Sequence, residues 1–259
     1  MQPAICLLSV VPMRKEPGHR SEMVSQLLFG EYVDRGEEKD DFVFVKCLYD
    51  GYEGWVQANQ LTPVAEEKVV NTSDYIGAFT AEVAVNGRCR QLPFAVPIYS
   101  SEKTGDSLHV GDQQVNYHVP GEAVWKSREK LFSKESLDAV VDIFLDAPYL
   151  WGGKSVFGID CSGFVQQVFK LFGIKILRDA YLQAAQGSEV RNLDEARLGD
   201  LLFFQNEKGR ITHVGILLEN REIVHASGKV RIDTVDGDGI INRETGKRTH
   251  QFHSIRRFF

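Results

Sequence analysis

The stretch Gly158-Ile159-Asp160-Cys161-Ser162-Gly163-Phe164 decides how the second half of this chain folds. Asp160 is a favoured residue type for a helix N-cap, and the apolar residues after it recur at helical spacing. They are Phe164, Val165, Val168, Phe169 and Phe172, and Gly173 stands where helices commonly end. We therefore expect a helix that starts at Cys161 and ends before Gly173, with the cysteine in its first turn.

A cysteine at a helix N-terminus is a candidate nucleophile. The partial positive charge and unpaired N–H groups of a helix start favour the thiolate, which is the reactive form. The alternative is a buried and unreactive thiol, the common state of a free cysteine. The four cysteines, Cys6, Cys47, Cys89 and Cys161, lie far apart without a Cys-x-x-Cys pair. We therefore expect free thiols, no metal site and no cofactor.

Two histidines downstream can complete such a site. His213 and His225 lie in β-type runs, residues 211–218 and 223–226, which we expect to form a hairpin. With a three-residue loop centred on Asn220, His225 is the diagonal neighbour of His213 on one face; a two-residue loop would separate their faces. On one face, His213 can take the proton of Cys161 while His225 orients its ring. A lone strand histidine is more often a core or surface residue, and that alternative stays open here.

The surrounding pattern predicts an α+β domain over residues 126–259. Leu137, Val140, Val141, Phe144 and Leu145 share one helical face after Ser133, so a helix is expected to about Asp146, before Pro148. Strands are expected at residues 201–204, 211–218, 223–226, 230–234 and 254–258.

Short β-type runs dominate the first half of the chain. Runs at residues 5–11, 26–33, 42–48 and 54–56 predict a small β-barrel over residues 1–65. A weaker set at residues 79–85, 95–99 and 114–118 predicts a second small barrel over residues 66–125. Its turns are expected at Asn86-Gly87, Thr104-Gly105 and Pro120-Gly121.

Five motifs follow one another in the second half. They are Pro148-Tyr149-Leu150-Trp151-Gly152-Gly153, the Gly158 to Phe164 stretch, Leu198-Gly199-Asp200-Leu201, His213-Val214-Gly215-Ile216 and His225-Ala226-Ser227. In this order and spacing, residues 126–259 resemble the NlpC family of cell-wall cysteine peptidases. The resemblance implies a papain-like core with Cys161 as nucleophile, His213 as base and His225 as the orienting third member. It also implies Tyr149 and the Cys161 N–H near the oxyanion, where preorganised donors matter most.

The first half also resembles members of this family. Gly30-Glu31 and Asp50-Gly51-Tyr52-Glu53-Gly54-Trp55-Val56 are similar to the bacterial SH3-like barrels that precede the catalytic domain in members of the dipeptidyl-peptidase VI type. In those members a barrel closes one side of the cleft, and acidic and aromatic groups hold the free amine of an N-terminal L-Ala. The implied substrate is a small murein peptide, L-Ala-γ-D-Glu-diamino acid, cut after γ-D-Glu. The implied substrate contacts are Asp160, Ser162, Trp151, Glu31 and Tyr52.

These contacts suit the chemistry, because an ammonium in a closed cleft needs a carboxylate partner. Each has a plainer alternative. Glu31 can be a solvated strand-end charge, Asp160 an N-cap alone, and Trp151 and Tyr52 packing aromatics. Ala180, after Arg178-Asp179, departs from the relatives, in which a Ser or Thr often stands there. One substrate contact is therefore expected to be absent.

The composition of the chain argues against several classes of partner. The chain has 259 residues, a formal net charge of −6 and no basic stripe, so nucleic acid and anionic membranes are unexpected partners. No run reaches the roughly 18 apolar residues of a membrane helix. We expect a monomer, cytoplasmic as the chain stands, or periplasmic or secreted if a signal peptide was removed. Two other functions stay open: an amidase or acyltransferase on the same Cys-His core, or an inert wall-binding protein.

Overall fold

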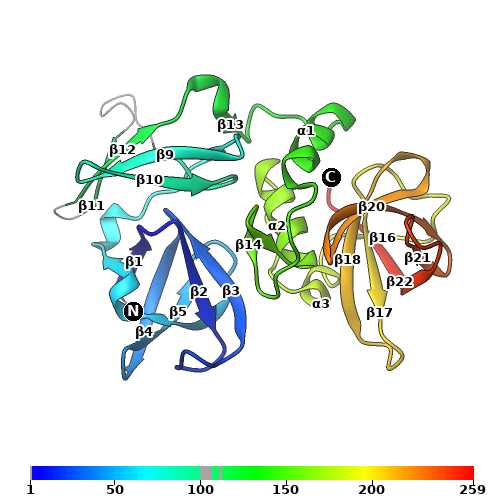
Figure 1. Cartoon of the computed structure of the whole chain (residues 1–259), viewed down its shortest axis with the longest axis horizontal. Helices are drawn as coiled ribbons and strands as arrows, with labels where there is room; N and C mark the ends of the chain where they lie inside the picture. Colours follow the sequence, from blue (N-terminus) through cyan, green and yellow to red (C-terminus); the bar gives the residue numbers. More distant parts are fainter. Residues whose placement is uncertain (1, 100–106, 111–112) are drawn as a thin grey trace. The chain divides into compact units, whose positions relative to one another are not determined.

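The computed structural model describes residues 2–99, 107–110 and 113–259, and it divides into two compact units (Figure 1). The first unit comprises Met1–Lys130, Trp151–Phe157 and Leu171–Gly173. The second comprises Leu131–Leu150, Gly158–Lys170 and Ile174–Phe259. The predicted turn at Thr104-Gly105 lies outside the described residues. The predicted domain boundaries at 65/66 and 125/126 stay predictions.

The first unit begins with a seven-stranded antiparallel sheet in the order β3-β2-β6-β5-β4-β1-β7. Its strands are β1 (Gln2–Cys6), β2 (Val10–Arg14), β3 (Met23–Leu28), β4 (Tyr32–Lys39), β5 (Phe42–Cys47), β6 (Glu53–Gln57) and β7 (Leu61–Pro63). The predicted runs 5–11 and 26–33 are wrong in extent, because each divides between two strands. The second run breaks at Gly30, whose φ of 79° is a backbone conformation that glycine adopts without strain.

A second set of strands follows in the same unit. A four-stranded sheet has the order β10-β9-β12-β11, and β13 pairs with β8. The bounds are β8 (Asp74–Ile76), β9 (Thr80–Val85), β10 (Arg88–Pro93), β11 (Ser107–Val110), β12 (Gln113–His118) and β13 (Val124–Lys126). The turn at Asn86-Gly87 is confirmed, with positive φ at both residues as a tight hairpin turn requires. The predicted strand at 95–99 is wrong, because Ala95 has a φ of 63° and the segment forms a single bridge, from Pro97 to Tyr75 of β8.

One core joins the two strand sets of the first unit. Ile5 and Phe29 from the first set and Ile76, Val83 and Tyr117 from the second belong to the same buried cluster. A separate cluster fills the first sheet alone, with Val11, Met13, Leu27, Val43 and Val56 among its buried members. The described residues also contain four short 3₁₀ turns: η1 (Ala58–Gln60), η2 (Glu66–Lys68), η3 (Gly121–Ala123) and η4 (Glu219–Arg221).

The second unit starts with the two helices that the sequence predicts. α1 (Lys134–Phe144) is capped by Ser133, whose hydroxyl accepts from the Ser136 N–H, and it buries four apolar residues. Each such residue contributes about 1.5–3 kcal/mol when buried. α2 (Cys161–Leu171) ends at a backbone bond from Ile174 N to Phe169 O of 3.0 Å, a C-terminal arrangement that the positive φ of Gly173 permits. α3 (Ala180–Gln183) was not predicted, since one helical turn is too short to show a period.

An antiparallel sheet forms the rest of the second unit, in the order β16-β22-β17-β18-β19-β20-β21. β21 also pairs with β22, so the six strands from β22 to β21 close into a ring. The bounds are β16 (Ser188–Val190), β17 (Leu201–Gln205), β18 (Ile211–Leu217), β19 (Glu222–Ser227), β20 (Lys229–Asp236), β21 (Gly239–Ile241) and β22 (Arg248–Arg257). The two-residue strands β14 (Lys154–Ser155) and β15 (Gly158–Ile159) precede α2. The four predicted strands at 201–204, 211–218, 223–226 and 230–234 are confirmed, and the one at 254–258 is wrong in extent, because β22 begins at Arg248. β16 and β21 were missed because three-residue strands carry little alternation.

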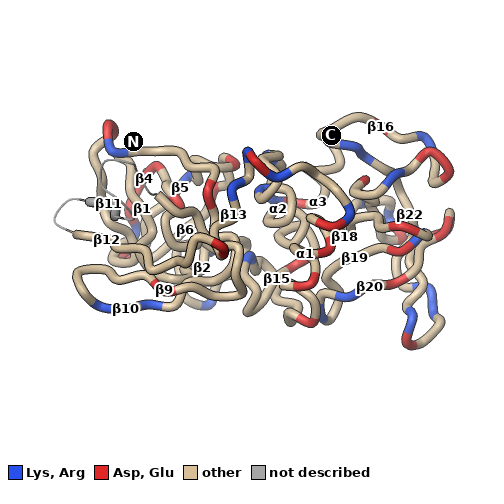
Figure 2. Tube along the Cα trace, turned by 90° about the horizontal axis from the view of Figure 1, so that it is seen from above, with Lys and Arg blue, Asp and Glu red and all other residues tan. Residues whose placement is uncertain are grey.

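The α+β layout is confirmed for the second unit, although the chain as a whole is mostly sheet with few helices. Figure 2 shows basic and acidic residues interspersed along the described part of the chain. Within the described residues, no helix combines the length and the apolar character needed to cross a membrane.

Candidate active site

The start of α2 places Cys161 as predicted. Asp160 caps the helix, since its Oδ1 accepts the Gly163 N–H at 2.7 Å. Cys161 is buried, and its thiol lies against β18, where the backbone of Val214 hydrogen bonds to it. Burial, and then the charge of Asp160, raise the pKa of the Cys161 thiol to about 12, against the backbone bonds of Val214 and Ser162 that lower it. Burial of the thiol therefore outweighs the preference of a helix start for the thiolate, and the resting nucleophile is a neutral thiol.

The hairpin of β18 and β19 has the loop length that puts His213 and His225 on one face. Ile216 pairs with Val224 and Leu217 with Ile223, and Leu218 N donates to Glu222 O at 2.8 Å. This leaves a three-residue loop centred on Asn220. The same register puts residue 213 opposite 227 and residue 215 opposite 225, so His213 and His225 are diagonal neighbours on one face. Gly215 lies between them without a side chain. A Cβ built there would be only 3.0 Å from the Cβ of His225.

The two histidines are hydrogen bonded, and the chain of contacts continues past them. His213 Nε2 lies 2.8 Å from His225 Nδ1, and His225 Nε2 lies 3.0 Å from Asp233 Oδ2. All three side chains are buried. Burial by itself raises the pKa of Asp233, but hydrogen bonds from His225, the Arg243 N–H and Arg231 outweigh it and hold this pKa well below its ordinary value. Asp233 is therefore an ionised end to this chain.

His213 lies in apolar and aromatic surroundings. Its ring stacks on that of His250 from β22, with 4.1 Å between centroids and an interplanar angle of 23°. Burial, followed by the neighbouring His225 and His250, lowers the pKa of His213 well below its ordinary value. Burial likewise lowers the pKa of His250 to about 4. His213 is therefore a neutral base near pH 7, able to accept a proton.

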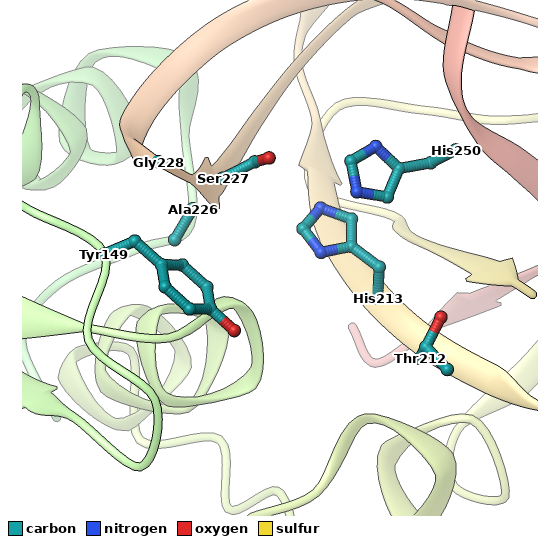
Figure 3. A pocket seen from close by; sticks show the side chains of 7 residues that line it. All are labelled: Tyr149, Thr212, His213, Ala226, Ser227, Gly228 and His250. Atoms are coloured by element: carbon teal, nitrogen blue, oxygen red, sulfur yellow. The ribbon is translucent and has the colours of Figure 1, made fainter.

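A cavity of about 250 Å³ opens beside this base. In Figure 3 the side chains of Tyr149 and His213 face it from opposite sides, with residues 226–228 along its rim. Tyr149 is fastened to that rim by its N–H, which donates to Gly228 O at 2.9 Å. Burial and the nearby Cys161 and Asp160 raise the Tyr149 pKa, so the hydroxyl keeps its proton and remains a donor.

Asp160 and Ser162 share a buried arginine. Arg178 donates to both oxygens of Asp160, at 2.9 and 2.7 Å, and to the Ser162 hydroxyl at 2.9 Å. Arg178 is 1% exposed, among the least exposed large side chains of the structure. This bidentate pair anchors the first turn of α2, which carries Cys161. Substrate binding by Asp160 and Ser162 stays a prediction.

The other three predicted contacts belong to the first unit. Both oxygens of Glu31 accept from the buried Lys154 ammonium at 3.0 Å. Trp151 is 60% exposed, and its Nε1 donates to Glu22 at 2.9 Å. Tyr52 packs against the core of the first sheet. Glu31 is thus not a solvated strand-end charge, and the role of all three in substrate binding stays a prediction.

Sequence reasoning missed Asp233, His250 and the pairing role of Arg178. A signal for Asp233 was present in the alternation of the strands. Asp233 of β20 pairs with Ile223 of β19, and His225 is two residues after Ile223, so Asp233 and His225 share a face. His250 carried no such signal, because its place depends on how β22 closes the ring. Among the described residues, no group of three His, Cys, Asp or Glu side chains is arranged to hold a metal ion.

Comparison with known proteins adds a family and several relatives. Residues 146–249 match the model of the NlpC/P60 family, and residues 13–61 match that of a bacterial dipeptidyl-peptidase SH3 domain. The γ-D-glutamyl-L-lysine dipeptidyl-peptidase of Bacillus subtilis strain 168 is 51% identical over 221 residues, covering 78% of this chain and 71% of that protein. Dipeptidyl-peptidase 6 of Lysinibacillus sphaericus is 27% identical over 262 residues, 90% of this chain and 92% of the relative. An NlpC/P60 family protein from Bacillus cereus ATCC 10987 has a similar fold, with a TM-score of 0.82 at 21% identity over 99% of both chains.

Proposed function

This chain belongs to the NlpC/P60 family of cysteine peptidases, and we propose that it hydrolyses the γ-D-glutamyl-diamino acid bond of small murein peptides with a free N-terminal L-Ala. The observation that carries the proposal is the hydrogen-bonded pair of His213 and His225, with His213 lining a cavity of about 250 Å³ and Cys161 bonded to the backbone of Val214, the residue next to His213. The substrate class follows the name of the relative that is 51% identical.

The proposed reaction begins from a neutral pair. As Cys161 Sγ attacks the γ-carbonyl carbon of D-Glu, its proton passes to His213. His213 then gives this proton to the amine of the diamino acid, and the C–N bond breaks to leave a thioester. Water, activated by the same histidine, hydrolyses the thioester and restores the thiol.

Hydrogen-bond donors near the Cys161 thiol are proposed to stabilise the oxyanion. The Tyr149 hydroxyl faces the cavity and keeps its proton, and the Cys161 N–H stands at a helix start. Such donors act at the atom where negative charge develops in the transition state. Both are therefore proposed to hold the carbonyl oxygen.

The carboxylates proposed to bind the substrate amine are already paired with a basic side chain. Asp160 pairs with Arg178, and Glu31 pairs with Lys154. A substrate ammonium would have to share one of these pairs. A free-amine requirement also suits peptides already released from the wall, so we propose turnover or recycling of such peptides as the setting.

The test uses four peptides: L-Ala-γ-D-Glu-L-Lys, L-Ala-γ-D-Glu-diaminopimelate and the N-acetylated form of each. Products are identified by mass spectrometry, with Cys161→Ala as the inactive control. Release of L-Ala-D-Glu from the free peptides alone supports the proposal, and the two rates rank the diamino acids. Equal cleavage of the acetylated forms would remove the amine requirement, and no cleavage of any peptide would overturn the proposal.

A further inference from the structure

We infer that Asp233 is a positioning residue for the reaction, because its carboxylate sets the ring tautomers of His225 and, through it, of His213. The inference rests on the proposed function, in which His213 is the base. Asp233 does not touch the reacting atoms, so its effect must pass through the two rings.

Asp233 is held so that it can only accept. Its side chain is 2% exposed, and Oδ1 accepts from Arg231 Nη2 at 3.0 Å and from the Arg243 N–H at 2.9 Å. Oδ2 is left for His225 Nε2 at 3.0 Å. An ionised carboxylate has no proton to donate, so the hydrogen of this contact belongs to His225 Nε2.

The tautomer of each ring then follows from the one before. A His225 ring that carries its single proton on Nε2 has a lone pair on Nδ1. The contact of 2.8 Å between that atom and His213 Nε2 therefore needs a proton on His213 Nε2. His213 Nδ1 is left with a lone pair, and in Figure 3 a ring nitrogen of His213 faces the cavity on the Tyr149 side. The neutral base is thereby set to receive the thiol proton at Nδ1.

The negative charge of Asp233 also favours the charged state that His213 enters during the reaction. When Cys161 transfers its proton, His213 becomes a cation, and the carboxylate lies one ring beyond it. Other titratable or charged groups also surround these rings. His250 stacks on His213, and Tyr149 lines the same cavity. Arg231, whose Nη1 lies 3.9 Å from Glu244 Oε2, and Cys161 are the remaining ones. Among the described groups that hydrogen bond to the rings of His213 and His225, the Asp233 carboxylate is the group that carries a negative charge.

The first experiment compares Asp233→Asn with Asp236→Asn on the proposed peptide substrate. Asp236 lies on the same strand but pairs with Arg248 at a partly exposed position, so it is a matched control. For Asp233→Asn we expect kcat to fall about 10- to 100-fold with KM unchanged, less than when a triad carboxylate that contacts the base directly is replaced. The acid limb of kcat should move to lower pH, because loss of the anion makes His213 harder to protonate.

A purely structural role would lower the melting temperature and the amount of active enzyme without moving the acid limb, and that outcome would overturn the inference. The second experiment needs neither a variant of Asp233 nor a substrate. Long-range ¹H–¹⁵N spectra of the unmodified chain, assigned with His213→Gln and His225→Gln, should show both rings protonated at Nε2. A proton on His213 Nδ1 would overturn the inference even if the peptidase activity is confirmed.

Discussion

Replacement of Gly215 by alanine tests whether the two histidines depend on the space between β18 and β19. A Cβ at this position would lie 2.7 Å from Ile223 Cδ1, 2.8 Å from Ile223 Cγ1 and 3.0 Å from His225 Cβ. The Ile223 atoms belong to the end of a side chain that can rotate. His225 Cβ can move only with its backbone, so the strand must shift.

The expected magnitude follows from these contacts. Overpacking a well-packed core costs about 1–3 kcal/mol. For a unit of this size, that corresponds to a fall in melting temperature of roughly 4–12 °C. A shift of about 0.8 Å would stretch the His213–His225 contact from 2.8 Å to a length that is no longer a hydrogen bond. Misplacement on this scale costs about 100-fold in rate.

The assay is kcat/KM on L-Ala-γ-D-Glu-L-Lys together with the thermal transition of the second unit. Gly237→Ala is the matched control, because a Cβ there meets nothing within 4 Å. We expect Gly215→Ala to lose both activity and stability and Gly237→Ala to retain both. A Gly215→Ala variant with normal kcat/KM would refute the reasoning, whether or not its melting temperature falls.

Two further predictions concern the thiol and its anchor. In a Cys89→Ser background, which removes the exposed thiol, the rate of Cys161 alkylation by iodoacetamide should still be rising at pH 9, because burial, more than the charge of Asp160, raises its pKa to about 12. A plateau below pH 7 would reveal a resting thiolate and contradict this. Arg178→Met should lower the free energy of unfolding by about 3–5 kcal/mol in urea, because Asp160 stays buried without its cation. Adding Asp160→Asn should recover part of that loss, and no recovery would count against the ion-pair explanation.

The elements that lie close together in the sequence were predicted well. Ser133 and Asp160 cap α1 and α2, and the period of the apolar residues located both helices. The sequence predicted the hairpin and the condition that a three-residue loop would put His213 and His225 on one face, and the structure shows that loop. These features depend on backbone propensities and on contacts a few residues apart, which can be worked out from the order of the residues.

The errors share one cause. The predicted strand at residues 95–99 failed because β propensity alone does not make a strand: Ala95 has a positive φ, and the segment pairs with β8 at a single bridge. The effect of the helix start on the Cys161 thiol could not be weighed from the sequence, because the buried surroundings of the thiol outweigh it. Neither pairing nor desolvation can be judged without the neighbours that the fold supplies.

The sequence by itself determined the helix that carries Cys161, the two strands that carry His213 and His225, and the family that these motifs resemble. Only the tertiary structure showed Asp233 behind His225, His250 against His213, and Arg178 beneath Asp160. The physical reason is range: capping and strand alternation act over a few residues, whereas these contacts form only when the ring of strands closes and its interior excludes water.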